Sequence, residues 1–61
     1  MIEDIKTILT RLNLDFMAKP TDSPDVVEVW PLCQDFAEAL DAAGYYTAPD
    51  FGRNCLIVTT A

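Results

Sequence analysis

The sequence has no histidine among its 61 residues and only one serine, Ser23. Histidine is the side chain that most often acts as a general base near neutral pH, and it is the commonest metal ligand. Ser23 lies in a proline-flanked loop with no base nearby in the sequence. Two cysteines, Cys33 and Cys55, cannot complete a tetrahedral zinc site in one chain without histidine. We therefore predict no catalytic residues and no metal site.

Glycine is also scarce, with only Gly44 and Gly52 in the chain. A glycine-rich loop that could cradle a phosphate group is therefore excluded. Asp22 and Asp25 share a loop, but the segment lacks the ligand spacing and the central glycine of a calcium loop. Paired carboxylates near Asp50 would need a cleft that so small a domain can hardly supply. We expect a protein that is not an enzyme and holds no cofactor.

Basic residues are few: four lysines and arginines stand against ten aspartates and glutamates, and the formal net charge is −6. Affinity for nucleic acid comes mainly from basic side chains that neutralise phosphates, so we expect no direct nucleic-acid binding. The same charge opposes docking on anionic membrane surfaces. The composition favours a protein partner with a basic surface, although charge of this size also serves solubility alone.

Long apolar runs are missing, and the longest spans residues 55–58, far short of a membrane span. No basic and then apolar leader precedes the first helical pattern. Two cysteines are too few for the disulfide framework of small secreted domains, and both are expected to be core or edge residues. We expect a complete small cytoplasmic protein that begins at Met1 and has reduced thiols.

About half of the residues are apolar, which is enough for the chain to fold as a single domain over residues 1–61. Apolar residues recur at helical spacing in two segments. The first predicts a helix over residues 2–12, closed by Asn13, and the second predicts a helix over residues 31–43, with Pro31 in its first turn and Gly44 after its end. A core this small makes the domain marginally stable.

Four further segments favour strands, at residues 14–19, 26–30, 45–48 and 54–60, with loops at 20–24 and 49–53. Strands joined by loops of about five residues pair antiparallel, because a parallel pair needs a longer crossover. We therefore predict an α+β fold of order αββαββ. Its two layers are a four-stranded, mostly antiparallel sheet and two helices on one face of that sheet.

The acidic residues Asp35, Glu38 and Asp41 recur every three residues along the second predicted helix, which gives a rise of about 4.5 Å per step. This spacing is of the same order as the phosphate spacing of about 3.4 Å along a nucleic-acid strand. One interpretation is a negative face that imitates a polyanion and binds a basic protein surface. The other is an ordinary solvated helix face.

Trp30 alternates with the valines of its predicted strand and would share a sheet face with Glu28. Tryptophan beside charge is a common composition of interface hot spots. The alternative, which we favour, is that Trp30 plugs the end of a small core. Of Tyr45 and Tyr46, one should face the core and the other solvent. We take Glu28, Trp30 and Tyr46 as further candidate partner-binding residues, and Phe51 is expected at a loop tip.

The last predicted strand, residues 54–60, carries no charge after Arg53. Such a strand must be central, covered, or paired with a second chain. The third case gives an alternative function, a structural or regulatory subunit that self-assembles into a homodimer through this strand.

The chain is small, has an acidic helix at Asp35, Glu38 and Asp41, and lacks catalytic residues. In these features it resembles the small phage-encoded inhibitors of the anti-CRISPR type. The resemblance implies an inhibitor that occupies a basic, nucleic-acid-binding surface of a host defence complex, as a DNA mimic, in the host cytoplasm. Immunity proteins and antitoxins share the same features. The resemblance transfers no site residues.

Overall fold

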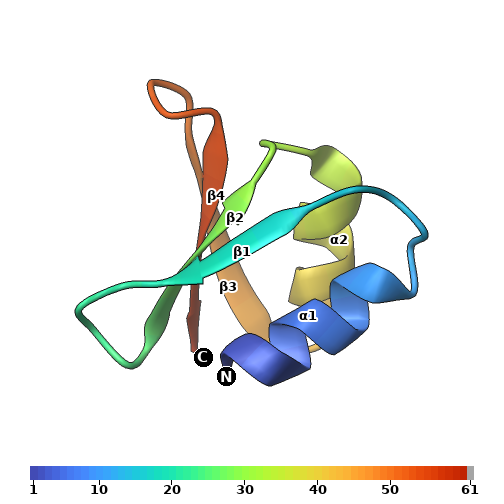
Figure 1. Cartoon of the computed structure of the whole chain (residues 1–61), viewed down its shortest axis with the longest axis horizontal. Helices are drawn as coiled ribbons and strands as arrows, with labels where there is room; N and C mark the ends of the chain where they lie inside the picture. Colours follow the sequence, from blue (N-terminus) through green and yellow to red (C-terminus); the bar gives the residue numbers. More distant parts are fainter. Residues whose placement is uncertain (61) are drawn as a thin grey trace.

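The computed structural model describes residues 1–60 of the chain. Its elements occur in the order αββαββ (Figure 1). Their bounds are α1 Ile2–Thr10, β1 Met17–Pro20, β2 Val26–Trp30, α2 Gln34–Ala42, β3 Tyr45–Asp50 and β4 Cys55–Thr60. Both the number and the order of the elements confirm the prediction from the sequence.

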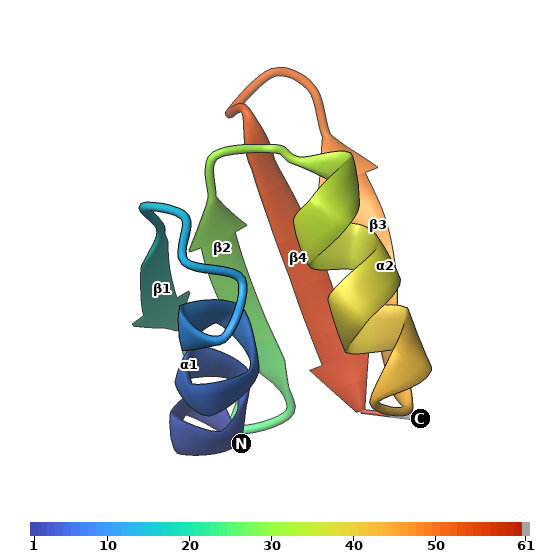
Figure 2. The ribbon, with the colours of Figure 1, turned by 90° about the vertical axis from the view of Figure 1, so that its right-hand side faces the viewer.

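The four strands form one antiparallel sheet in the spatial order β1-β2-β4-β3. Two local hairpins, β1–β2 and β3–β4, are joined where β2 pairs with β4, so that Val27 lies opposite Val58. Both helices lie against the same face of the sheet, as Figure 2 shows from the helix side. The predicted two-layer α+β sandwich is therefore confirmed, and no helix or strand within residues 1–60 covers the opposite sheet face.

The core lies between the helices and the sheet. Its buried cluster draws two residues from each helix and two from each central strand: Ile5, Leu9, Val27, Val29, Phe36, Leu40, Leu56 and Val58. Phe16, at the entry to β1, meets Phe36 edge to face with ring centroids 6.4 Å apart. No charged or polar side chain is buried among residues 1–60. Hydrophobic burial and close packing thus hold the two layers together.

Each helix is followed by the residue that the sequence predicted in the left-handed region, three residues after the end of α1 and two residues after the end of α2. After Thr10 the chain makes one tighter turn, in which the Leu12 and Asn13 amides donate to the carbonyls three residues earlier, and Asn13 has φ 58°. This turn explains why α1 ends before residue 12. After α2, Gly44 takes φ 97° and its amide donates to the Asp41 carbonyl. Both stop residues satisfy helix-end carbonyls that would otherwise lack partners.

The start of α2 was predicted wrongly, because Pro31 is not in its first turn. The Leu32 amide donates to the Asn54 carbonyl at 2.8 Å, which holds residues 31–32 beside the start of β4. Cys33 is then the extended N-cap residue, and its carbonyl accepts the Ala37 amide. The helix begins at Gln34, since the backbone before it is still bonded to Asn54, the residue that precedes β4.

The outer strands also differ from their predicted bounds. β1 begins at Met17 instead of Leu14, and both outer strands include a proline that was predicted to lie in a loop, Pro20 in β1 and Pro49 in β3. Proline cannot donate a ladder hydrogen bond, so it is tolerated where one side of a strand is free. β1 and β3 are the two edges of this sheet.

The last strand, β4, is central and pairs with β2 on one side and with β3 on the other. Of the three predicted situations for this strand, the central one is correct. β4 therefore has no free edge, which corrects the expectation that a second chain could pair with it and form a homodimer in that way. Because β4 is paired on both sides, it needs no charged residue to prevent pairing with a second chain.

Substitution at the two glycines should separate backbone strain from side-chain crowding. Gly44→Ala should lower the free energy of unfolding by about 1–2 kcal/mol, because an alanine at φ 97° carries the left-handed penalty although nothing lies within 4 Å of its Cβ. Gly52→Ala is the matched control, since its Cβ would meet only Asp50 Oδ1 at 3.6 Å. Urea denaturation of both variants measures the difference, and equal losses would contradict the strain at Gly44.

Candidate binding surfaces

The three acidic residues predicted on α2 are all exposed on the outer side of the helix, and we call them the acidic row: Asp35, Glu38 and Asp41. α2 packs on β3 and α1 through Phe36 and Leu40, which turns the acidic row away from the core. The helix contains no lysine or arginine. Within residues 1–60, no carboxylate of the row forms an ion pair.

Two members of the acidic row are held by neutral hydrogen-bond donors. Gln34 Nε2 donates to Glu38 Oε2 at 3.0 Å, one helical turn away. Thr47 Oγ1, on β3, donates to Asp41 Oδ1 at 3.0 Å. These contacts restrict the carboxylates without neutralising their charge. The acidic row is therefore a partly ordered group of negative charges on a rigid helix.

The second surface is the sheet face opposite the helices, which we call the open face. Because Val27 and Val29 point into the core, the alternate residues of β2 point away from the helices, and strand pairing extends this assignment to the other strands. The open face comprises Met17, Lys19, Val26, Glu28, Trp30, Tyr46, Ala48, Asp50, Cys55, Ile57 and Thr59.

The candidate residues predicted from the sequence are thus divided between two layers. Asp35, Glu38 and Asp41 lie on α2, whereas Glu28, Trp30 and Tyr46 lie on the open face. One flat partner surface could not contact both groups. Tyr46 is 65% exposed while Tyr45 packs against the core, as expected from strand alternation.

Trp30 lies between two cations on the open face. Its ring centroid is 5.7 Å from Lys19 Nζ and 5.4 Å from Arg53 Cζ, and its Nε1 donates to the Arg53 carbonyl at 3.0 Å. The interpretation of Trp30 as a plug for the core is wrong, because its neighbour Val29 takes the inward position of β2. Cation–π contacts and one hydrogen bond fix the indole instead.

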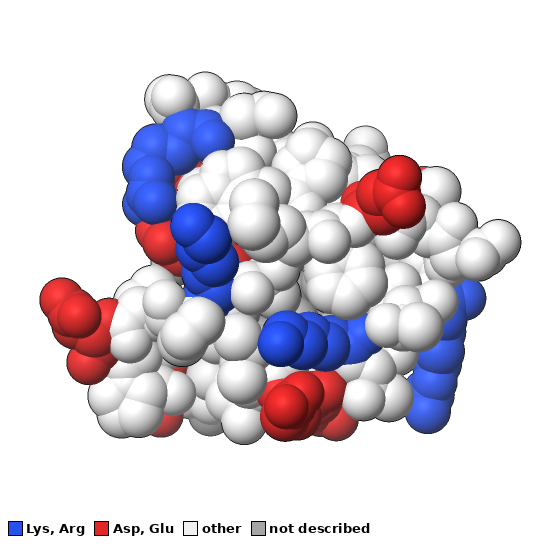
Figure 3. All heavy atoms as spheres, viewed as in Figure 1, with Lys and Arg blue, Asp and Glu red and all other residues white. Residues whose placement is uncertain are grey.

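Arg53 connects the turn between β3 and β4 to the middle of the open face. Its guanidinium forms an ion pair with Glu28, and this hydrogen bond raises the pKa of Arg53 above its ordinary value. Its amide donates to Asp50 Oδ1 at 3.2 Å, which closes the turn. Figure 3 shows basic and acidic atoms in contact on the left, in the region of the sheet in Figure 1. Basic and acidic side chains are therefore neighbours on this surface, whereas α2 carries no basic side chain.

Cys55 belongs to the open face by strand alternation, yet it is completely buried. It pairs with Asp50 on β3, and continuation of the β2–β4 register puts it opposite Trp30. Burial raises the pKa of the Cys55 thiol, so the thiolate form is disfavoured. Cys33 is half-buried against the core, and neither cysteine is in a disulfide. Both positions agree with the predicted core or edge placement.

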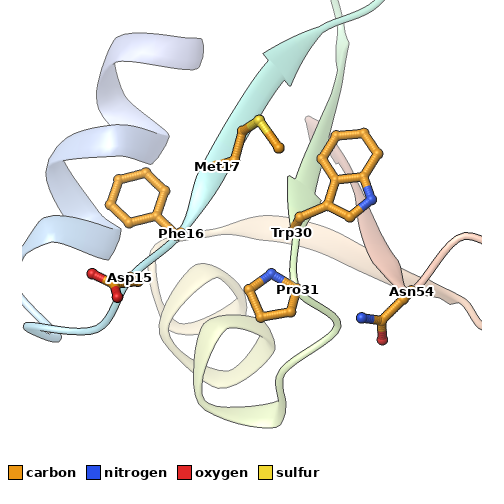
Figure 4. A pocket seen from close by; sticks show the side chains of 6 residues that line it. All are labelled: Asp15, Phe16, Met17, Trp30, Pro31 and Asn54. Carbon is orange, nitrogen blue, oxygen red and sulfur yellow. The ribbon is translucent and has the colours of Figure 1, made fainter.

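A hollow of about 340 Å³ lies beside Trp30, at the end of the sheet where β1 begins and β2 ends. Its walls are Asp15, Phe16, Met17, Trp30, Pro31 and Asn54 (Figure 4). Most of its lining is apolar, and we call it the end hollow. Met17 is half exposed at its rim, with 50% of its surface accessible. The end hollow can accept an apolar side chain but offers no group for acid–base chemistry beyond the Asp15 carboxylate.

Phe51 projects from the turn between β3 and β4, at the same end of the sheet as the end hollow, and is 79% exposed. Its place at a loop tip was predicted. Sequence reasoning did not identify Met17, Lys19 or Arg53 as neighbours of Trp30. Alternation assigns Met17 and Lys19 to one side of their strand, but only the β1–β2 register places them beside Trp30 and Glu28.

Within residues 1–60, no group of three histidine, cysteine or acidic side chains lies close enough to hold a metal ion. Neither described helix is long and apolar enough to cross a membrane. Comparisons of the chain with protein-family models, with curated proteins and with solved structures found no match. Function is therefore inferred from the chemistry of the acidic row and the open face.

Proposed function

We propose that the chain is a non-enzymatic inhibitor that binds a basic surface of a protein partner through the acidic row of α2. The observation that carries the proposal is the charge of this helix: Asp35, Glu38 and Asp41 are exposed, and none of them forms an ion pair within residues 1–60. Such a row is complementary to a surface that normally binds phosphates.

The geometry supports mimicry of a nucleic acid in one further respect. Successive positions of the acidic row rise by about 4.5 Å along the helix axis, which is of the same order as the phosphate repeat of about 3.4 Å in one strand. Gln34 and Thr47 restrain two of the three side chains, so binding would order fewer torsions. The partner class is therefore a nucleic-acid-handling complex, of the kind that anti-CRISPR proteins block, in the cytoplasm of the host cell.

Charge reversal on α2 tests the proposal. The variant carrying D35K, E38K and D41K should lose about 100-fold or more in affinity for the partner, because like charges would then face one another across the interface. Partners would be captured from a lysate of the cells in which the protein acts and eluted with rising salt. The wild-type complex should dissociate as salt rises, since exposed charges are screened over about 8 Å at physiological ionic strength.

A matched control separates the acidic row from net charge alone. The variant carrying E3K, D22K and D25K changes three exposed acids outside α2 and outside the end hollow, and both variants have a formal net charge of −6 + 6 = 0. The affinity of the control for the partner should stay within about tenfold of wild type, because direct contact with the acidic row, and not long-range electrostatic steering, determines the affinity. A duplex DNA competitor should displace the captured protein. The role of the acidic row would be refuted if both variants lost the same affinity for the partner. It would also be refuted if neither salt nor competitor DNA released the captured protein.

A further inference from the structure

Charge is balanced on the open face. It carries the acids Glu28 and Asp50 and the base Lys19, and Arg53 of the adjoining turn extends its guanidinium over Trp30 as a second base. The whole chain has ten acids and four bases, so the remaining surface carries eight acids and two bases. Two copies of this chain repel over that remaining surface, because like charges facing one another are strongly unfavourable. On the open face this repulsion is absent.

The uncharged residues of the open face have the composition of an interface core. Trp30 and Met17 lie side by side across the β1–β2 pair, Ile57 is half-buried beside Glu28, and Tyr46 is largely exposed. Aromatic residues and methionine are enriched at the centres of protein interfaces. A 61-residue chain with a small core also gains more from extra apolar burial than a larger domain does.

One end of the open face has both a projection and a hollow of complementary chemistry. Phe51 projects from the turn 51–54, and Asn54, the last residue of the same turn, lines the end hollow. Phe51 itself is not among the lining residues. Because projection and hollow are neighbours, a two-fold axis passing between them brings each Phe51 to the hollow of the other copy.

We propose that two copies of the chain associate through their open faces about a two-fold axis, with each Phe51 ring seated in the end hollow of the other copy. Lys19 and Arg53 of one copy then meet the acidic residues Glu28 and Asp50 of the other. With Asp15 at the rim of the end hollow, the contact carries three acids and two bases per copy, a net charge of −1 against −5 for the remaining surface. The interface is isologous, so it closes at the dimer.

The association leaves the acidic rows free. Both helices lie on the far side of each sheet, so the dimer has four layers and presents one acidic row on each outer surface (Figure 2). If the proposed function holds, such a dimer is a bivalent binder. The proposal itself does not rest on that function.

Sedimentation velocity over a range of concentrations tests the association. The mass should rise from monomer to dimer with concentration, and added salt should preserve or strengthen the dimer, because it screens the repulsion between two net-negative chains. Trp30 is the sole tryptophan and reports on the face directly. Its fluorescence should shift to longer wavelength on dilution, as the indole becomes solvated. A monomeric mass at every concentration would overturn the proposal and leave the open face to a different protein.

Phe51→Ser tests the seating of the ring in the end hollow. Removing this side chain should weaken the dimer by about tenfold or more. Burial of a phenylalanine side chain contributes more binding free energy than a tenfold change in affinity requires. The substituted residue is exposed in the monomer, so the fold should persist. Leu14→Ser is the control, because Leu14 is another exposed apolar residue that lies outside the end hollow and the acidic row, and it should leave the dimer unchanged. If Phe51→Ser dimerised as strongly as wild type, the proposed contact would be refuted. This outcome does not depend on whether the acidic row binds a partner.

Discussion

Phe36→Ala is expected to unfold most of the protein. Phe36 is the largest of the fully buried side chains, contacts Phe16 edge to face, and belongs to the buried cluster that also includes residues of both central strands. Truncating a buried Phe to Ala typically costs about 3–5 kcal/mol, through lost transfer energy and the cavity left behind. At 0.05–0.15 kcal/mol per residue, a 61-residue domain has a total stability of roughly 3–9 kcal/mol. The loss is therefore comparable with the whole stability.

The matched control for this prediction is the same substitution at an exposed ring. Phe51→Ala removes an equal side chain that is 79% exposed, so unfolding of the monomer should change by less than about 0.5 kcal/mol. Thermal unfolding followed by circular dichroism, at a dilution where the chain is monomeric, compares the two variants with wild type. A cooperative transition in Phe36→Ala near the wild-type midpoint would contradict the assigned core.

Val58→Lys should abolish folding, whereas Thr59→Lys should be tolerated. Val58 is fully buried in the central strand, opposite Val27, and its outward neighbour Thr59 is only half-buried on the open face. A lysine at 58 would place an unpaired ammonium group in the core, which costs several kcal/mol even after relaxation. At 59 the same side chain reaches solvent and adds positive charge to an acidic chain.

The pair of lysine variants tests strand register with one chemical change at two adjacent positions. Thr59→Lys should keep the free energy of unfolding within about 1 kcal/mol of wild type, because surface substitutions rarely have larger effects. Far-ultraviolet circular dichroism and urea denaturation measure both variants. If the two lysines were equally disruptive, the alternation assigned to β4 would be incorrect, and with it the composition of the open face.

Most of the local structure could be predicted from the sequence, because local patterns determine it. The apolar spacing of Ile2 to Leu12 and of Leu32 to Ala43 indicates two helices, and Asn13 and Gly44 take the expected left-handed conformations. The predicted strand 26–30 matches β2 residue for residue. The start of α2 could not be predicted, since it depends on the Leu32–Asn54 hydrogen bond between segments distant in sequence.

The candidate site was predicted only in part, for a related reason. Exposure of Asp35, Glu38 and Asp41 follows from the helical wheel alone. By contrast, the division of the candidate residues between two layers depends on which sheet face the helices cover. The neighbours of Trp30 also depend on pairing, because Lys19 reaches it from β1 and Arg53 from the turn before β4. Nothing local in the sequence specifies the strand order β1-β2-β4-β3.

The prolines of the edge strands have a consequence for the behaviour of the protein at high concentration. β1 ends with Pro20 and β3 contains Pro49, so each exposed edge has a position with no amide hydrogen to offer an incoming strand. The segment 55–60 is uncharged and rich in strand-forming residues, a composition typical of segments that form amyloid-like cross-β stacks. It is enclosed between β2 and β3. Fibril formation should therefore require the sheet to open first, and its rate should follow the small population of unfolded chains.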